Sequence, residues 1–412
     1  MKLARWAPYA VAGVLVLLDF LLVARSLPQA RPGADYAIWA LNHGSYTDVL
    51  KLSLDHYLRA GGVVHPLPYV HDQIEYPVLL GFLLWLPSWL PGGPSSWLAA
   101  DGVITFAAVV VTIALLRRAH PRGVWWIAAS PALLLTSAIN WDLVGIAFLV
   151  ASVVFFAERR HTPSGVAAAI GTCVKLFPVV VAPIALAALG SAWWRAGAGS
   201  RRAPSSAWWR WAIPFAGVTA LVFVPFLLVA ASNTLYFVRF NGMRPEKDSL
   251  WGMLGKAIGP WLSGSHFVNM ASFVVVVAAV LAASWAVWRL PVEHQARGVA
   301  LGTAIALIAW MAVNKVWNPQ YLLWVFAAGA ITSAPAPLGV ALGVVTVWDW
   351  WFEFVLRIPD HVNPYAWAGY TSVIARTVVF ALMVGWCALE LRRLGVARAP
   401  ARPEVRPVPS PA

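Results

Sequence analysis

The chain has 412 residues, of which 60% are hydrophobic and 11% are charged, and its mean hydropathy is +0.70. Soluble globular chains carry about 25% charged residues, so this composition excludes a soluble protein and indicates a chain embedded in a lipid bilayer. The formal net charge of +13 reflects arginines clustered in short loops between apolar runs, which is a mark of membrane topology and argues against a nucleic-acid partner. The two cysteines, Cys173 and Cys387, both lie in apolar runs and offer neither a disulfide framework nor a zinc pattern.

Apolar runs that are long enough, or nearly so, to cross about 30 Å of hydrocarbon follow one another along the chain. They predict an all-α polytopic membrane protein with about twelve membrane segments, roughly ten to twelve of them full crossings, in one transmembrane domain over residues 1–394. The first run follows two basic residues as a secretory signal would. It contains Asp19 and lacks a small-residue cleavage site, so we expect a retained anchor. The predicted segments are residues 7–25, 76–90, 98–116, 124–139, 142–157, 165–190, 210–231, 266–288, 296–313, 318–334, 337–356 and 366–389.

Basic residues predict the orientation, because cytoplasmic loops are enriched in lysine and arginine. The amino terminus, residues 191–210, Arg289 with Arg297, and the carboxyl-terminal tail are all basic. We therefore expect a multi-pass protein of the cell membrane with both termini in the cytoplasm. Residues 395–412 are rich in proline, alanine and arginine and have little to bury, which predicts a disordered cytoplasmic tail.

Two further basic loops conflict with a simple count of crossings. Residues 117–122 and 159–161 would lie outside the cell if every predicted segment crossed once. Both return to the cytoplasm if one segment within 76–116 and the proline-interrupted run 165–190 are re-entrant hairpins. The sequence alone leaves both topologies open, and with them the side on which Asn140 lies.

Two long hydrophilic stretches, residues 26–75 and 232–265, face outward under either topology, and a shorter one covers 357–365. The first is unusually rich in acids and histidines. The spacing from Ser45 to Leu58 predicts an amphipathic helix on the membrane surface, which would hold Asp48 near the headgroups. For any one acid, the simpler interpretation is a solvated loop residue that keeps the segment in water.

Short motifs in this loop continue in order along the chain, and together they are similar to the signature of glycosyltransferase family 87. Asn318 departs from that signature, in which serine is usual at this position. The motifs are Ser45-Tyr46-Thr47-Asp48, Pro68-Tyr69 with Glu75-Tyr76-Pro77-Val78-Leu79, Ile139-Asn140-Trp141-Asp142-Leu143, Gly171-Thr172-Cys173-Val174-Lys175-Leu176-Phe177-Pro178, and Asn314-Lys315-Val316-Trp317-Asn318-Pro319-Gln320-Tyr321-Leu322-Leu323-Trp324.

This resemblance implies a GT-C-like membrane enzyme without a cofactor. It would transfer a sugar, commonly mannose, from a polyprenyl-phosphate donor to a glycolipid or glycan acceptor on the extracytoplasmic face, with inversion at the anomeric carbon. An arabinose or glucose lipid donor is left open. A transporter or flippase of a lipid-linked sugar would also need many helices and buried cations. The long acidic loop after the first helix favours the enzyme, since a transporter does not require it.

A sugar hydroxyl needs a nearby carboxylate to accept its proton as the new bond forms. The resemblance places such a base in the first outward loop, which makes Asp48 the first candidate and Asp35 its rival. Glu75 borders a predicted membrane helix. It would either orient the acceptor or favour the amino end of that helix by its charge.

The leaving lipid phosphate needs fixed cations or hydrogen-bond donors in the absence of a metal. Lys175 lies within an apolar run, and an intramembrane cation is costly unless it is paired or faces a polar cavity. It would therefore bind the donor phosphate, reach an interface, or pair with Asp142. Lys315, Arg244 and Arg239 are the other phosphate candidates, although loop arginines are often ordinary surface charges.

Several polar residues beside the predicted membrane segments are candidates for substrate binding. Asn318 precedes a helix start at which free backbone donors could face an anion or a sugar hydroxyl, and a simple start signal explains the same pattern. Asn140 would line the site if it faces outward, and would cap a helix otherwise. The expected substrate-binding residues are Tyr46, Tyr76, Asn140, Asp142, Asn318, Gln320 and Tyr321.

Other charged residues have simpler interpretations. Asp349, Glu353 and Arg376 fall in the last two predicted helices, where we expect them to pair with one another. The histidines of the first loop lack the i, i+4 spacing of a helical zinc site, so no metal is expected there. These histidines are His43, His56, His65 and His71.

Overall fold

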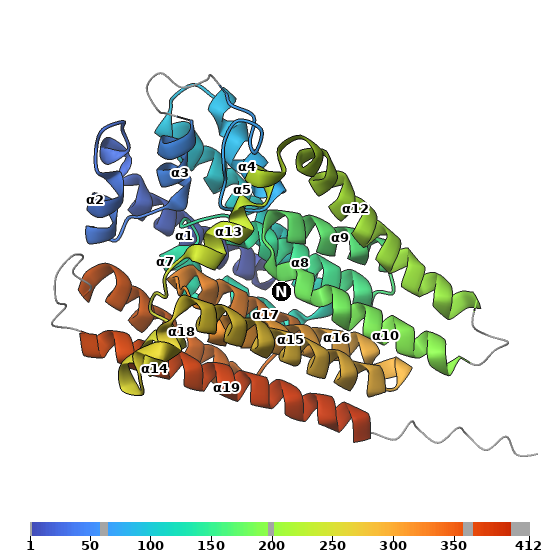
Figure 1. The fold of residues 1–412 in the computed structure, drawn as a ribbon. Helices are drawn as coiled ribbons and strands as arrows, with labels where there is room; N and C mark the ends of the chain where they lie inside the picture. The colour runs from blue at the N-terminus through green and yellow to red at the C-terminus, as the bar shows by residue number, and fades with distance from the viewer. Residues whose placement is uncertain (1, 58–64, 197–201, 357–365, 397–412) are drawn as a thin grey trace, which may run out of the picture.

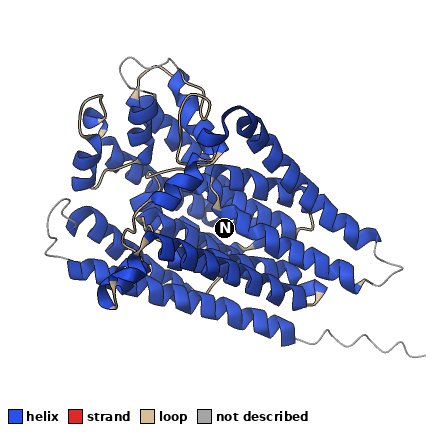
Figure 2. Ribbon diagram, in the orientation of Figure 1, coloured by secondary structure: helices blue, strands red, loops and turns tan. Residues whose placement is uncertain are grey.

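The computed structural model describes residues 2–57, 65–196, 202–356 and 366–396. Within these ranges the chain consists of helices and connecting loops without a β-strand (Figure 2), which confirms the predicted all-α class. The helices are α1 (Lys2–Ala24), α2 (Tyr36–Asn42), α3 (Asp48–His56), α4 (Val78–Trp85), α5 (Pro94–Ala119), α6 (Val124–Ala128), α7 (Pro131–Thr136), α8 (Asp142–Ala157), α9 (His161–Val174), α10 (Val181–Arg195), α12 (Arg202–Thr234), α13 (Tyr236–Met243), α14 (Leu250–Ala257), α15 (Ser265–Arg289), α16 (Gln295–Val313), α17 (Leu322–Thr332), α18 (Ala336–Trp351) and α19 (Ala366–Val396).

Eight of the described helical segments are long and apolar enough to cross a membrane. They are built on α1, α5, α10, α12, α15, α16, α18 and α19. The remaining predicted segments are shorter or broken, so the expected number of about twelve is not confirmed. Residues 124–139 form two short helices because Pro131 begins a new helix, and residues 318–334 contain only the 11 residues of α17 as regular α-helix.

The basic connections of the described chain meet at one end of the helical bundle. The Arg117 guanidinium donates a hydrogen bond of 2.6 Å to the backbone carbonyl of Arg5, and Arg118 pairs with Glu158 at 2.7 Å. The Arg195 guanidinium donates to the backbone carbonyls of Trp288 and Leu290, at the end of α15. A count of one crossing for each predicted segment would place residues 117–122 and 159–161 on the opposite side from the amino terminus. In the structure these connections lie together with it.

The contact between Arg117 and Arg5 also determines the path of the chain between α1 and α5. Since α5 ends where α1 begins, the two helices run in opposite directions, and the intervening α4 and the 3₁₀ turn Leu86–Trp89 do not cross the bundle. The predicted membrane segment 76–90 is therefore not a full crossing of this bundle, as the alternative with one re-entrant segment within 76–116 requires. Figure 1 shows α2, α3 and α4 together, at the opposite end of α1 from the amino terminus.

The run 165–190 is not one helix but two, α9 and α10, separated by an extended residue and a 3₁₀ turn. Lys175 has φ −139° and ψ 130°, which ends α9, and Pro178 lies in the turn Phe177–Val180 that follows. The start of α9 lies beside Arg210 of α12. The end of α10 also precedes α12. The start of α9 and the end of α10 therefore lie near the basic connections, and the turn that joins the two helices, with Lys175, lies at the other end of the bundle.

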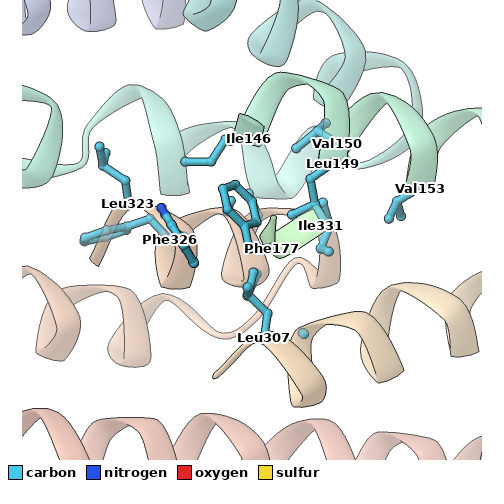
Figure 3. Close-up of a cluster of buried hydrophobic side chains, with 14 of the residues drawn as sticks. Ile146, Leu149, Val150, Val153, Phe177, Leu307, Leu323, Phe326 and Ile331 are labelled. Atoms are coloured by element: carbon cyan, nitrogen blue, oxygen red, sulfur yellow. The ribbon is translucent and has the colours of Figure 1, made fainter. Parts of the chain in front are cut away.

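A tightly packed apolar core supports this turn. The Phe177 ring stacks on Trp324 with centroids 3.9 Å apart and planes at 30°. Figure 3 shows Phe177 among side chains of α8, α16 and α17, including Ile146, Leu307 and Leu323. Gly145 permits the approach, because a Cβ at that position would lie 2.9 Å from the Phe177 ring. The position of Lys175, two residues earlier, is therefore determined by close packing.

The first outward loop folds back onto the helices. The predicted amphipathic helix is present as α3, shorter than the 45–58 segment, and its Val49, Leu50 and Leu52 side chains are buried in the protein core. The loop over 232–265 contains α13 and α14. The stretch 357–365 and most of the predicted tail, residues 397–412, lie outside the described residues.

Candidate functional site

Asp48 begins α3 and is held by backbone contacts to a distant loop. Its backbone N–H donates to the Ile139 carbonyl at 2.8 Å, and the hydroxyl of Thr47 donates to the same carbonyl at 3.2 Å. Thr47 also caps α3 by accepting the N–H of Val49 at 3.1 Å. The first outward loop and the connection between α7 and α8 are therefore joined at the residue that carries the carboxylate.

Three side chains donate hydrogen bonds to the Asp48 carboxylate. The Tyr46 hydroxyl lies 2.9 Å from Oδ1, the Tyr76 hydroxyl lies 2.9 Å from Oδ2, and the Asn140 amide nitrogen lies 3.3 Å from Oδ2. These donors are neutral, so they orient the carboxylate without cancelling its charge. Asp48 itself remains partly exposed. The carboxylate is thus fixed and accessible, which are two requirements of a general base.

Tyr76 connects this carboxylate to a buried ion pair. Its ring lies beneath the Lys175 ammonium, with Nζ 4.2 Å from the ring centroid. Lys175 pairs with Asp142 at 3.1 Å, and the two side chains are only 7% and 1% exposed. The charge of Lys175 is therefore compensated within the protein. Of the three possibilities that the sequence left open for Lys175, the structure shows the ion pair with Asp142. Two motifs separated by about a hundred residues in the chain meet at Tyr76.

Asn140 performs both roles that the sequence treated as alternatives. Its amide nitrogen donates to Asp48, while its Oδ1 accepts the backbone N–H of Asp142 at 3.1 Å, at the first turn of α8. One side chain thereby caps a buried helix and lines the candidate site. The side of Asn140 follows from this contact: it lies at the same end of the bundle as Asp48.

Glu75 lies in the same electrostatic environment. Burial and the nearby charge of Asp48 raise the pKa of the Glu75 carboxyl, while His56 and Arg244 act in the opposite direction. His56 hydrogen-bonds the Asp72 carboxylate at 2.5 Å, a pairing that no pattern in the sequence indicates. Among the residues that the structure describes, no cluster of histidines, cysteines and acids could hold a metal ion.

Two cations approach this region from the second outward loop and the segment after α16. Burial and the neighbouring Arg244 lower the pKa of Lys315, so the two cations are close enough to interact. The Lys315 ammonium donates to the Gly242 carbonyl at 2.8 Å. Arg244 also acts electrostatically on Glu75 and on Tyr321. Arg239, the third candidate, is exposed, and its guanidinium donates to the carbonyl of Ser232 at 2.7 Å.

Lys315 is held in place by a short extended pairing between its own segment and the second outward loop. The backbone N–H of Lys247 donates to the Lys315 carbonyl at 2.9 Å, and the N–H of Trp317 donates to the Lys247 carbonyl at 2.9 Å. Just beyond it, the Asn318 amide donates to the Tyr321 hydroxyl at 3.4 Å. Gln320 is buried, and its side-chain oxygen has no hydrogen-bond partner among the described residues.

The remaining predicted residues have structural contacts elsewhere. Asp35 is exposed and caps α2 by accepting the N–H of Ile38 at 3.3 Å. Asp349 pairs with Arg376 at 3.0 Å, as expected, whereas Glu353 pairs with Lys247 of the second outward loop at 2.6 Å. The first pair joins α18 to α19, and the second joins the turn after α18 to the second outward loop.

A large hollow lies apart from these residues. An apolar groove of about 1210 Å³ runs between α6, α7 and α18, from Arg122 near the basic end to Trp351 near the opposite end. It contains none of the predicted site residues. A Cβ on Gly44 would lie 3.4 Å from the Trp350 ring, so the far end of α18 lies against the segment that leads to Asp48.

Comparison with known proteins agrees with the motifs. A model of glycosyltransferase family 87 matches residues 75–314, which is more than half of the chain. The chain belongs to glycosyltransferase family 87. It is therefore a glycosyltransferase, and the predicted resemblance is confirmed. The matched region contains Glu75, Tyr76, Asn140, Asp142 and Lys175, among other site candidates, and begins after Asp48.

Among solved structures, the chain is similar to a crystal structure of ArnT from Cupriavidus metallidurans bound to undecaprenyl phosphate. The sequences are 17% identical and the TM-score is 0.45, over 92% of this chain and 72% of that chain. No curated protein matches the chain.

Proposed function

We propose that this family 87 glycosyltransferase moves a sugar, with mannose as the first candidate, from a polyprenyl-phosphate donor to a glycolipid or glycan acceptor. The observation that carries the proposal is the Asp48 carboxylate, which is partly exposed and held by Tyr46, Tyr76 and Asn140. Such a carboxylate can accept the proton of an acceptor hydroxyl as that oxygen attacks the anomeric carbon. Attack opposite the leaving phosphate would invert the configuration at that carbon.

Arg244 and Lys315 are the proposed partners of the departing phosphate. Neither forms an ion pair among the residues that the structure describes. The two positive charges repel each other, so an anion bound beside them would be stabilised by both. Lys175 contributes less directly, since Asp142 compensates its charge, and we propose that it holds Tyr76 in place through the face of its ring. Asn318, Gln320 and Tyr321 follow Lys315 and would contact the sugar or the phosphate.

The groove between α7 and α18 is proposed to hold the isoprenoid chain of the donor. Its lining is mostly apolar, and its far end lies against the segment that precedes Asp48. An isoprenoid chain that enters this groove from the bilayer would contact apolar side chains and would meet no exposed polar backbone. Its phosphate would reach the outward loops.

The orientation follows from the charges. The connections that meet at one end of the bundle carry many arginines, so we place that end and both termini in the cytoplasm. Asp48 and the second outward loop then face the extracytoplasmic side, where the transfer would occur.

The test is transfer from radiolabelled polyprenyl-phosphate mannose to membrane lipid or glycan, with purified protein in defined vesicles. Asp48→Asn keeps the size of the side chain and removes its basicity, so we expect a loss of about 10²- to 10⁴-fold in kcat. Asp55→Asn is the matched control, because Asp55 lies on the same helix and forms a half-buried ion pair with Lys51. We expect wild-type transfer for this control. Asp35→Asn distinguishes the rival base.

Full transfer by folded Asp48→Asn would refute the assignment of the base. Absence of transfer by the wild type, together with movement of the intact lipid-linked sugar between leaflets, would support the flippase alternative. Parallel assays with arabinose and glucose lipid donors would identify the sugar.

A further inference from the structure

A carboxylate inside the first membrane helix contacts the loop that supports Asp48. Asp19 lies in α1 and is only 2% exposed, whereas its helix neighbours Leu17, Leu18 and Leu21 are exposed on the outer surface. Its Oδ2 accepts the hydroxyl of Ser137 at 2.9 Å and the backbone N–H of Ala138 at 2.8 Å. A buried acid in an apolar helix is costly unless it makes such bonds, and residues of this kind commonly serve function.

The bonded segment leads directly to the candidate site. Ile139, the next residue, provides the carbonyl that accepts the N–H of Asp48 and the hydroxyl of Thr47. Asn140 follows and donates to the Asp48 carboxylate. Asp19 is therefore one peptide unit away from the backbone that holds Asp48, and two residues away from one of its three side-chain donors.

The local geometry explains why this segment needs an external support. Helix α7 ends at Thr136 and α8 begins at Asp142, so residues 137–141 have few helical hydrogen bonds of their own. The Ala138 N–H, which would otherwise be buried without a partner, is satisfied by Asp19. Both bonds end on the same oxygen of a buried side chain, so Asp19 joins Ser137 and Ala138 to α1 at one point.

We infer that Asp19 is a positioning residue for the transfer reaction. It holds residues 137–140 so that the Ile139 carbonyl and the Asn140 amide keep Asp48 in its reactive position. This inference rests on the proposed role of Asp48. The acid within the first apolar run was the sequence signal for it, although the run by itself indicated only a membrane anchor.

The deciding experiment measures kcat and KM for the variants Asp19→Leu, Asp19→Asn and Asn140→Ala, and for the double variant Asp19→Leu/Asn140→Ala. Asp19→Leu removes both bonds, and we expect kcat to fall about 10- to 100-fold with an unchanged KM for the lipid donor, since small displacements of a reacting group have effects of this size. Asp19→Asn keeps an oxygen that can accept both bonds, so we expect about threefold or less.

The double variant separates positioning from general stability. If Asp19 acts through the Asn140 segment, the second substitution adds little to the first, and the combined loss is well below the product of the single losses. A combined loss equal to that product would overturn the inference. Thr112→Val is the control for removing a buried polar group, since the Thr112 hydroxyl bonds only the Ala108 carbonyl of its own helix. We expect wild-type kcat for it.

Ser137→Ala is the second route if Asp19→Leu does not fold. It removes one of the two donors and leaves the Ala138 bond, so we expect a loss of about threefold in kcat. Wild-type kcat in both Ser137→Ala and any folded Asp19→Leu would refute the inference. The Asp48→Asn variant separates the two proposals: if it is inactive while Asp19→Leu is fully active, only the positioning role fails.

Discussion

The buried pair of Lys175 and Asp142 allows a quantitative test of what Lys175 does. Replacing Lys175 by Met removes the cation and leaves the Asp142 carboxylate, only 1% exposed, without its partner. Breaking a buried ion pair from one side typically costs about 3–5 kcal/mol of folding free energy, because the remaining charge is desolvated and uncompensated. Asp142→Asn leaves Lys175 over the Tyr76 ring, a contact that is worth about 2 kcal/mol when desolvated. We therefore expect the lysine substitution to be the more damaging one.

The assay is denaturation of the purified protein in one detergent, followed by transfer measurements on the folded fraction. The double variant Lys175→Met/Asp142→Asn removes both charges together, so we expect it to recover about 2 kcal/mol or more relative to Lys175→Met. If Lys175 acts mainly as half of this pair, the double variant also recovers transfer activity. Recovery of stability without any recovery of kcat would refute this reasoning, because one of the two side chains would then have a role in transfer beyond their pairing.

The other predictions concern the phosphate cations, Glu75 and the groove. Arg244→Ala and Lys315→Ala should each reduce kcat about 10- to 100-fold, whereas Arg239→Ala, the exposed control, should reduce it less than threefold; equal effects of all three in the transfer assay would argue against a specific phosphate site. Burial and Asp48 raise the pKa of Glu75 above its usual 4.5, so its contribution favours folding below about pH 4.5 and is lost as the pH rises through the folded-state value. Glu75→Gln should remove this part of the dependence of unfolding free energy on pH, and an unchanged profile would contradict the assigned cause. Gly343→Trp should obstruct the groove and raise KM for long-chain donors more than for a short-chain analogue; an equal rise for both would place the chain elsewhere.

Much of the fold was predictable from composition and periodicity. The all-α class, the first helix and the two long hydrophilic loops follow from apolar runs and from loops rich in charge, because lipid requires every backbone group of a spanning segment to be satisfied internally. The break at Lys175 was indicated by Pro178 within the run. Its depth in the bundle was not, because it depends on the packing of Phe177 against Trp324.

The candidate site, like the fold, was predictable from the sequence only in part. The motifs predicted which segments matter, and Tyr76, Asn140 and Asp142 belonged to the predicted set. Their contacts with Asp48 and Lys175 were beyond reach of the sequence, since these residues are separated by up to about a hundred positions and no periodicity relates them. The choice between a free and a paired Lys175 could only be made from the position of Asp142.

By itself, the sequence determined that the protein lies in a lipid bilayer, that it is helical, which family it belongs to and which residues could take part in catalysis or binding. Each of these depends on composition or on short local patterns. The tertiary structure alone decided that α4 does not cross the bundle, that Asn140 both caps α8 and binds Asp48, and that Asp19 reaches the same loop from inside the first helix. Each of these depends on contacts between segments far apart in the chain, and such contacts are selected by the packing and hydrogen bonding of the whole bundle.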